Sequence, residues 1–152
     1  MNELNKLLFL ENQLCFPLYA TSRLTTRVYS PYLKAIDLSY PQYLVMMLLW
    51  EEDKIPLQKI STRLYLDSNT LSPLLQRMET KGLILTKKNP QDERSRIIAL
   101  SPKGQALKLE AIKIPKQIVG AFRGSNLDAE ELKQFQKTLH RLLNALSEKV
   151  PR

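Results

Sequence analysis

The stretch DSNTLSPLLQRMETKGLILTKKNPQDERSRIIALS, residues 67–101, decides the fold. Asp67 and Ser68 are candidate caps for a helix that ends near Gly82, because such side chains begin helices and glycine ends them. The runs LILTKK and RIIALS flank the polar turn NPQDERS, and this pattern predicts a β-hairpin. The preceding run IPLQKISTRLYL, residues 55–66, predicts another short helix. A helix-turn-helix followed by a basic hairpin is the plan of a winged helix.

Two further helices are expected before this lobe. Residues 11–36 repeat apolar side chains at spacings near 3.6 residues, and Pro17 fits an early turn of such a helix. Ser39 as a cap and Pro41 in the first turn predict the start of the next helix. That helix is almost wholly apolar, so it should be buried on all sides at the centre of the fold.

Long helices are also expected after the lobe. Residues 102–123 predict a helix that Pro115 should bend, and Asp128 with Glu131 has the spacing of a capping box for a helix over about 129–148. The apolar faces of the terminal helices need a cover, and a two-fold dimer is the usual solution. The alternative is that these helices fold back onto the lobe.

The expected fold class is mainly α with a small β-wing. We expect a single domain over residues 1–152, with dimerisation helices at about 11–36 and 102–148. The winged helix-turn-helix should occupy residues of about 38–101. A chain of this length is long enough to bury one core.

The positive charge gathers in the middle of the chain. The net charge is +8, and residues 54–108 contain 11 Lys or Arg and 4 Asp or Glu, a balance of +7. Such a concentration is typical of a surface that binds the phosphate backbone of double-stranded DNA. A solvated basic face without a partner is the alternative.

Other classes of protein find little support in the sequence. The start MNELNKLLFLENQ lacks the pattern of a signal peptide, and the longest apolar run, YLVMMLLW, is too short to span a bilayer. One cysteine and one histidine cannot build a zinc site, and we find no phosphate loop or Ser/His/Asp set. We therefore expect a cytoplasmic protein that is not an enzyme, with no cofactor, no metal and no membrane partner.

The helix that should read DNA offers small polar side chains near its N-terminus, where helices of this kind contact base edges. The candidates are Ser68, Asn69, Thr70, Ser72, Gln76 and Arg77. The N-terminus of this helix should itself favour a phosphate. Its docking face should consist of Leu71, Leu74, Leu75 and Met78. For Arg77, the alternative to a DNA contact is a surface ion pair.

The turn NPQDERSR should form the tip of the wing. Arg94 or Arg96 at this tip could enter a minor groove, whose negative potential attracts a guanidinium group. The acidic Asp92 looks out of place beside DNA. We expect its carboxylate to accept hydrogen bonds from turn amides or to orient an arginine.

Several of these motifs match one family. The wing DERSR resembles that of the MarR family of winged-helix regulators, and the segments LENQLCFPLYA, SYPQYLVMMLLWEED, LYLDSNTLSPLLQRME and KGLI resemble its organic-hydroperoxide-sensing branch. The resemblance spans nearly the whole chain. It implies a homodimeric repressor that releases a palindromic operator when its sensor cysteine is oxidised by an organic hydroperoxide. The sensor lies in the QLCF motif and corresponds to Cys15.

The resemblance also implies how the thiolate is held. Tyr29 and Tyr40 correspond to two tyrosines that hydrogen-bond the thiolate across the dimer interface, and Tyr19 lies in the same pocket region. The residue types suit this role, since the thiolate is the nucleophile and both phenol donors and a helix start stabilise an anion. With no second cysteine, oxidised Cys15 must stay a sulfenic acid, condense with a backbone amide or form a mixed disulfide with a low-molecular-weight thiol.

Other interpretations of Cys15 and of the chain remain. The cysteine could be an inert core residue. The chain could be a MarR-type repressor that is relieved by a small aromatic ligand, with Cys15 incidental. A thiol peroxidase is disfavoured because there is no resolving cysteine and His140 stands alone in a helical pattern. The compact wing and the polar helix argue against a sequence-indifferent architectural protein.

Overall fold

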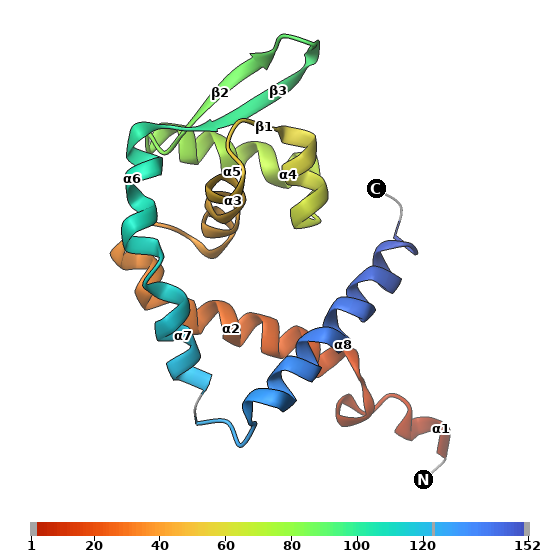
Figure 1. The fold of residues 1–152 in the computed structure, drawn as a ribbon. Helices are drawn as coiled ribbons and strands as arrows, with labels where there is room; N and C mark the ends of the chain where they lie inside the picture. The colour runs from red at the N-terminus through yellow and green to blue at the C-terminus, as the bar shows by residue number, and fades with distance from the viewer. Residues whose placement is uncertain (1–2, 123, 151–152) are drawn as a thin grey trace. The chain divides into compact units, whose positions relative to one another are not determined.

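The protein is mainly helical with a small antiparallel sheet, which confirms the expected fold class (Figure 1). The computed structural model describes residues 3–122 and 124–150. The helices are α1 (Glu3–Lys6), the 3-10 turn η1 (Leu10–Asn12), α2 (Cys15–Ala35), α3 (Tyr40–Glu51), α4 (Leu57–Leu64), α5 (Ser68–Thr80), α6 (Pro102–Ala111), α7 (Ile114–Phe122) and α8 (Ala129–Ser147). The strands are β1 (Ile55–Pro56), β2 (Ile84–Asn89) and β3 (Asp92–Leu100). The chain forms two compact units, Met1–Ile114 and Pro115–Arg152.

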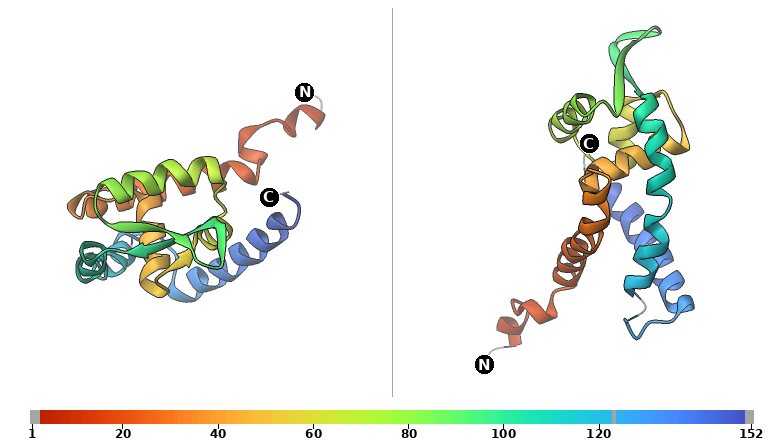
Figure 2. Two further views of the ribbon diagram at one scale, coloured as in Figure 1. Left: turned by 90° about the horizontal axis from the view of Figure 1, so that it is seen from above. Right: turned by 90° about the vertical axis from the view of Figure 1, so that its left-hand side faces the viewer.

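The first unit contains the winged lobe. Its sheet has the order β1-β3-β2 with both pairings antiparallel, and Ile98 of β3 lies opposite Ile55 of β1 and Thr86 of β2. The β2–β3 hairpin projects beyond α4 and α5 in Figure 1 and in the right-hand view of Figure 2. Strand β1 was not predicted, because two residues that include a proline give no alternating pattern.

Helix α3 lies at the centre of the lobe and contacts α2, α4, α5, α6 and β3. It buries Tyr43, Val45, Met46, Leu48 and Leu49, each worth about 1.5–3 kcal/mol of stabilisation by the usual value for buried apolar side chains. Its start is as predicted, with Ser39 as the cap and Pro41 in the first turn. The prediction of burial on all sides is wrong at Met47, which is exposed.

The expected helix over residues 11–36 begins at Cys15, so Pro17 is its third residue. The first amides of a helix have no partner within the helix, and the missing N–H of Pro17 therefore costs nothing there. The predicted position of Cys15 near a helix start is confirmed.

The expected bent helix over residues 102–123 is two helices, α6 and α7, separated at Ile112 and Lys113. Pro115 has no N–H for the carbonyl of Ala111, and its ring crowds that carbonyl. The helix therefore stops before the proline and restarts, which corrects the prediction of a bend. Residue 123, the last of the predicted helix, lies outside the described residues.

Helix α8 makes up half of the second unit. Its predicted capping box is confirmed: Asp128 Oδ1 accepts from the amide of Glu131, and Glu131 Oε2 accepts from the amide of Asp128, each at 2.8 Å. None of its residues is buried. Its apolar side chains include Phe135, Leu143 and Leu146, all exposed.

Candidate DNA-binding face and thiol site

Helix α5 separates its apolar and polar side chains as the sequence predicts. The docking residues Leu71, Leu74, Leu75 and Met78 are all buried. The six polar candidates on this helix are all exposed: Ser68, Asn69, Thr70, Ser72, Gln76 and Arg77. Arg77 takes part in none of the ion pairs among the described residues, so the alternative of a surface ion pair is not what the structure shows.

The N-terminus of α5 is capped by Asp67. Its Oδ1 accepts a hydrogen bond of 2.8 Å from the backbone N–H of Thr70. Hydrogen bonds from the backbone and the side chain of Thr70 lower the pKa of Asp67 below its usual value of 3.8. A carboxylate thus already occupies the position where we expected a phosphate, and like charges there would repel. The Asp67 cap therefore argues against a phosphate at this helix N-terminus, which stays a prediction.

The wing differs from its expected shape at the tip. The turn is confined to Pro90 and Gln91, and Arg94 and Arg96 belong to strand β3 rather than to the turn. The side chain of Asn89 accepts from the amide of Gln91 at 3.0 Å, which closes the turn early. Asp92 accepts from the amide of Arg94 at 3.0 Å, one of the two roles predicted for it.

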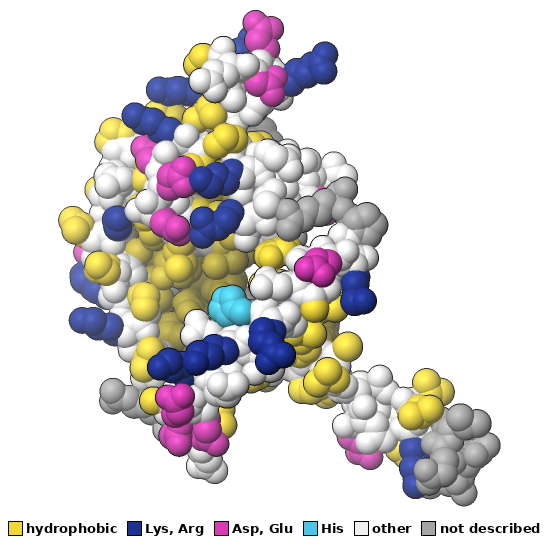
Figure 3. Space-filling view, turned by 45° about the vertical axis from the view of Figure 1, so that its right-hand side comes forward, with side chains coloured by type: hydrophobic (Ala, Val, Ile, Leu, Met, Phe, Trp, Pro, Cys, Tyr) yellow, Lys and Arg dark blue, Asp and Glu magenta, His cyan; other side chains and the backbone are white. Residues whose placement is uncertain are grey.

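The register shifts between Lys88 and Asn89, so that Asp92 lies opposite Asn89 while Arg96 lies opposite Lys88. The intervening Arg94 therefore falls in an irregular part of the ladder, and Asp92, Arg94 and Arg96 are all exposed. Figure 3 shows cationic and anionic side chains next to each other at the projecting end of the wing. The wing offers guanidinium groups from a strand end, which suits contact with a DNA backbone or minor groove.

Cys15 is the first residue of α2, and its side chain is exposed. This exposure contradicts the alternative in which the cysteine fills a core within its own chain. One turn further along, the hydroxyl of Tyr19 accepts a hydrogen bond of 2.8 Å from Arg23, whose guanidinium lies 5.6 Å from the centre of the tyrosine ring. A shallow depression of α2 is lined by Tyr19, Ala20, Arg23, Leu24 and Arg27. Arg23 was not predicted, although its i, i+4 spacing from Tyr19 indicates that the two side chains can meet on one face of the helix.

Tyr29 and Tyr40 are brought together by the packing of α2 on α3. Their ring centres are 5.0 Å apart in an edge-to-face arrangement, and Tyr43 lies 6.1 Å from Tyr29. Tyr43 was not predicted, and its ring centre lies 6.4 Å from that of Trp50. We call these four side chains the aromatic cluster.

Burial raises the pKa of Tyr29 and, together with the charge of neighbouring tyrosines, the pKa of Tyr40 and Tyr43. The three phenols therefore stay protonated at neutral pH and keep their O–H donors. None of the hydrogen bonds among the described residues involves the hydroxyl of Tyr29 or Tyr40, and neither hydroxyl is fully buried. Two neutral donors are thus available to an acceptor from outside this chain.

The structure does not bring Cys15 to these tyrosines. Cys15 and Tyr29 are 14 residues apart on the same regular helix, a separation of about 21 Å at 1.5 Å per residue. No rotation of side chains closes that gap within one chain.

An exposed polar recognition face on α5, a buried face that docks it and a projecting basic hairpin define a winged-helix DNA-binding protein. Among the described residues, no helix is long and apolar enough to cross a bilayer. The same residues contain no group of three His, Cys, Asp or Glu side chains placed to hold a metal ion.

Comparison with known proteins agrees with this class. The family model for the transcriptional regulator SarA/Rot matches residues 27–111. The organic hydroperoxide resistance transcriptional regulator of Bacillus subtilis is 47% identical over 140 residues, which are 92% of this chain and 93% of that protein. The structure of reduced AbfR bound to DNA, a protein of Staphylococcus epidermidis, has a TM-score of 0.76 and 35% identity over 90% of this chain and 94% of AbfR. Disulfide-formed AbfR has a TM-score of 0.61 and 35% identity over 88% and 92%.

The chain belongs to the MarR family of winged-helix transcriptional regulators. It is a DNA-binding transcriptional regulator, and its relatives are regulators rather than enzymes. By its place in the winged helix, α5 is the helix that we expect to be the recognition helix.

The wing generates a first prediction. Replacing Arg94 by alanine should weaken binding to operator DNA and reduce the slope of log K against log salt by about one unit, because one phosphate contact is lost. The measurement is a titration of labelled duplex at several salt concentrations. Arg94→Lys is the matched control, since it keeps the charge and should keep the slope. Unchanged affinity and slope in Arg94→Ala would remove this residue from the DNA-binding face.

The cap of α5 generates a second prediction. Asp67→Ala should lower the thermal midpoint of unfolding at pH 7. Because the pKa of Asp67 is lower in the folded state, its stabilisation is complete above about pH 3.8 and is lost as the pH falls through the folded value. The difference in midpoint between the two proteins should therefore narrow in acid. A difference that stays constant down to pH 2 would show that the carboxylate is not the cap.

Proposed function

We propose that the protein is a redox-sensing repressor that releases its operator when Cys15 is oxidised by an organic hydroperoxide. The observation that carries this proposal is that an exposed thiol and a protonated phenol lie far apart on the same helix, α2. Cys15 is the first residue of the helix, and Tyr29 lies about 21 Å further along it, packed against Tyr40 of α3. The relative from Bacillus subtilis, named for organic hydroperoxide resistance, supports the same class of oxidant.

The thiol of one chain and the tyrosines of another can meet if two chains associate. In a two-fold dimer each chain offers the same surface, so the thiol end of one α2 can face the tyrosine end of the other. The free donors of Tyr29 and Tyr40 would then stabilise the thiolate of Cys15 of the second chain, and Tyr19 would line the same pocket.

Exposed apolar side chains support the homodimer. Of the exposed large apolar residues, all but Met47, Tyr65 and Leu85 lie outside residues 38–101. Leu14 is 72% exposed and Leu24 57%, which is costly unless a partner covers them. We therefore propose residues 11–36 and 102–148 as the dimerisation helices and 38–101 as the DNA-binding lobe, all within a single MarR-type domain over residues 1–152.

The first step at Cys15 needs only the organic hydroperoxide as oxidant. The thiolate sulfur attacks the terminal peroxide oxygen, the O–O bond breaks, and the alkoxide leaves and takes a proton to become an alcohol. Sulfur is oxidised to a sulfenic acid. A low-molecular-weight thiol can then displace water to give a mixed disulfide. A disulfide within one chain cannot form, because Cys15 is the only cysteine.

The proposed DNA-binding residues are the exposed polar and charged side chains of α5 and the wing. We propose that the six polar side chains of α5 contact the major groove and that Asp92, Arg94 and Arg96 serve the wing. A dimer on a palindromic operator presents its two recognition helices about 34 Å apart, in successive major grooves. A bulky or polar group on Cys15 between the chains changes this spacing, and DNA is released.

The third prediction concerns the thiol. Wild-type protein should lose operator binding after treatment with cumene hydroperoxide and a small thiol, whereas Cys15→Ser should bind as tightly and keep the DNA. Binding is measured by fluorescence anisotropy, and mass spectrometry follows the adduct on Cys15. If Cys15→Ser also releases DNA with the peroxide, Cys15 is not the sensor. If neither protein responds to peroxide but both release DNA with a small aromatic ligand, the alternative of a ligand-relieved repressor holds.

The fourth prediction concerns assembly. The protein should sediment at roughly twice 17.6 kDa at micromolar concentration. Leu24→Glu should shift it toward the monomer, because the side chain is exposed in a single chain and would be covered in the dimer. Leu85→Glu, at an exposed apolar position of the wing, is the control and should stay dimeric. A wild-type protein that remains monomeric would rule out both the shared site and the paired recognition helices.

A further inference from the structure

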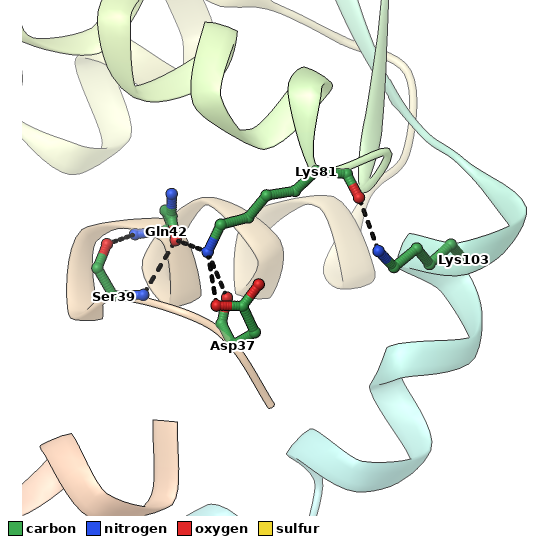
Figure 4. Close-up of polar contacts among 5 residues, drawn as sticks. All are labelled: Asp37, Ser39, Gln42, Lys81 and Lys103. Carbon is green, nitrogen blue, oxygen red and sulfur yellow. Dashed lines mark hydrogen bonds and ion pairs between the residues drawn. The ribbon is translucent and has the colours of Figure 1, made fainter. Parts of the chain in front are cut away.

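The corner between α2 and α3 is held by its own side chains. The chain turns there through Asp37, which has a left-handed backbone with φ of 53°. Ser39 then caps α3 in a reciprocal pair with Gln42: the amide of Ser39 donates to Gln42 Oε1 at 3.0 Å, and the amide of Gln42 donates to Ser39 Oγ at 3.4 Å. Gln42 is only 4% exposed, so its side-chain oxygen is a fixed acceptor (Figure 4).

Lys81 reaches this corner from the end of the recognition helix, as Figure 4 shows. Its Nζ donates to the backbone carbonyl of Asp37 at 2.6 Å, to Oδ1 of Asp37 at 3.1 Å and to Oε1 of Gln42 at 3.4 Å. An ammonium group has three N–H donors, so this set uses its full capacity. Lys81 is the residue that directly follows α5, and its ammonium points to the α2–α3 corner.

The backbone at the same helix end is held from another side. The carbonyl of Lys81 accepts from Nζ of Lys103 at 2.7 Å, and the carbonyl of Gly82 accepts from Oγ of Ser101 at 2.5 Å. Both donors belong to the start of α6. The C-terminal end of the recognition helix is therefore tied to α6 through its backbone and to the α2–α3 corner through the side chain of Lys81.

The Lys81 contact affects the orientation of helix α5 more than the stability of the fold. Asp37 has an 85% exposed side chain, and an exposed ion pair contributes little. The other two acceptors, a backbone carbonyl and a buried amide oxygen, are fixed in place. The 13 residues of α5 span about 20 Å, so a tilt of roughly 3° at the C-terminal end moves the N-terminal end by about 1 Å. A shift of that size changes the distance and angle of hydrogen bonds to base edges and weakens them.

We propose that Lys81 is a positioning residue of the DNA-binding face: it sets the direction of the recognition helix by tying its C-terminal end to the α2–α3 corner. Lys81 itself makes no contact with DNA. The proposal rests on the winged-helix DNA-binding function alone and does not depend on redox sensing by Cys15.

A comparison of specific and non-specific DNA binding separates a positioning role of Lys81 from a direct phosphate contact. Lys81→Met keeps most of the side-chain stem and removes the three donors. Its affinity for an operator duplex, selected from a random pool with the wild-type protein, should fall about tenfold, the loss of roughly one base contact. Its affinity for a scrambled duplex of equal length and the salt slope of both should stay unchanged, since no phosphate contact is lost.

Lys108→Met is the matched control. Lys108 also donates to a distant backbone carbonyl, that of Trp50 at 3.0 Å, but it does not touch the recognition helix. This variant loses the same charge and the same kind of contact, so its ratio of operator to scrambled affinity should equal that of the wild type. An equal fall of operator affinity in the two variants would overturn the proposal.

A second variant covers the possibility that Lys81→Met folds poorly. Asp37→Gly suits the left-handed backbone and removes only the carboxylate acceptor. It should lower the ratio of operator to scrambled affinity by a few-fold and have no further effect in the Lys81→Met background.

Two results would contradict the positioning role. A parallel loss of both affinities with a salt slope reduced by about one unit would make Lys81 a phosphate contact. An unchanged ratio in Lys81→Met and in Asp37→Gly would leave the contact with a structural role only.

Discussion

The fixed rise per residue of the α-helix keeps Cys15 and Tyr29 apart within one chain. A helix cannot fold back on itself, so Cys15 at the start of α2 and Tyr29 in its second half stay about 21 Å apart. The thiol is exposed, and the phenols of Tyr29 and Tyr40 keep unused donors that burial holds in the protonated form. In the proposed dimer, a second copy supplies what each chain lacks. In this proposal, dimer assembly and thiol chemistry depend on each other, because the site forms only where two chains meet.

Helix α3 connects this site to the DNA-binding face. Tyr40, which packs against Tyr29, is the first residue of α3 and directly follows its cap, Ser39. Gln42, the partner of Ser39 in the cap, accepts from Lys81 at the end of the recognition helix. The aromatic cluster and the recognition helix therefore share one corner of the fold. The buried remainder of α3 forms the core around which both are packed.

The sequence predicts what depends on neighbouring residues and misses what depends on distant ones. Helix starts at Ser39 and Asp128 follow from hydrogen bonds within three residues, and they were found where expected. The exposed polar face of α5 follows from helical periodicity. Pro115 was recognised, but whether a proline bends or ends a helix depends on packing. The contact of Lys81 with the corner spans 39 to 44 residues, and no local pattern marks it.

The most direct test of the central claim is a mixed dimer in which one chain carries Cys15→Ser and the other carries Tyr29→Phe with Tyr40→Phe. If the thiol of one chain is held by the tyrosines of the other, this dimer contains one complete site. Its remaining cysteine should then form the sulfenic acid with cumene hydroperoxide at the wild-type rate, while the homodimer of the tyrosine variant reacts slowly. A mixed dimer that reacts as slowly as that homodimer would contradict a site shared between two chains.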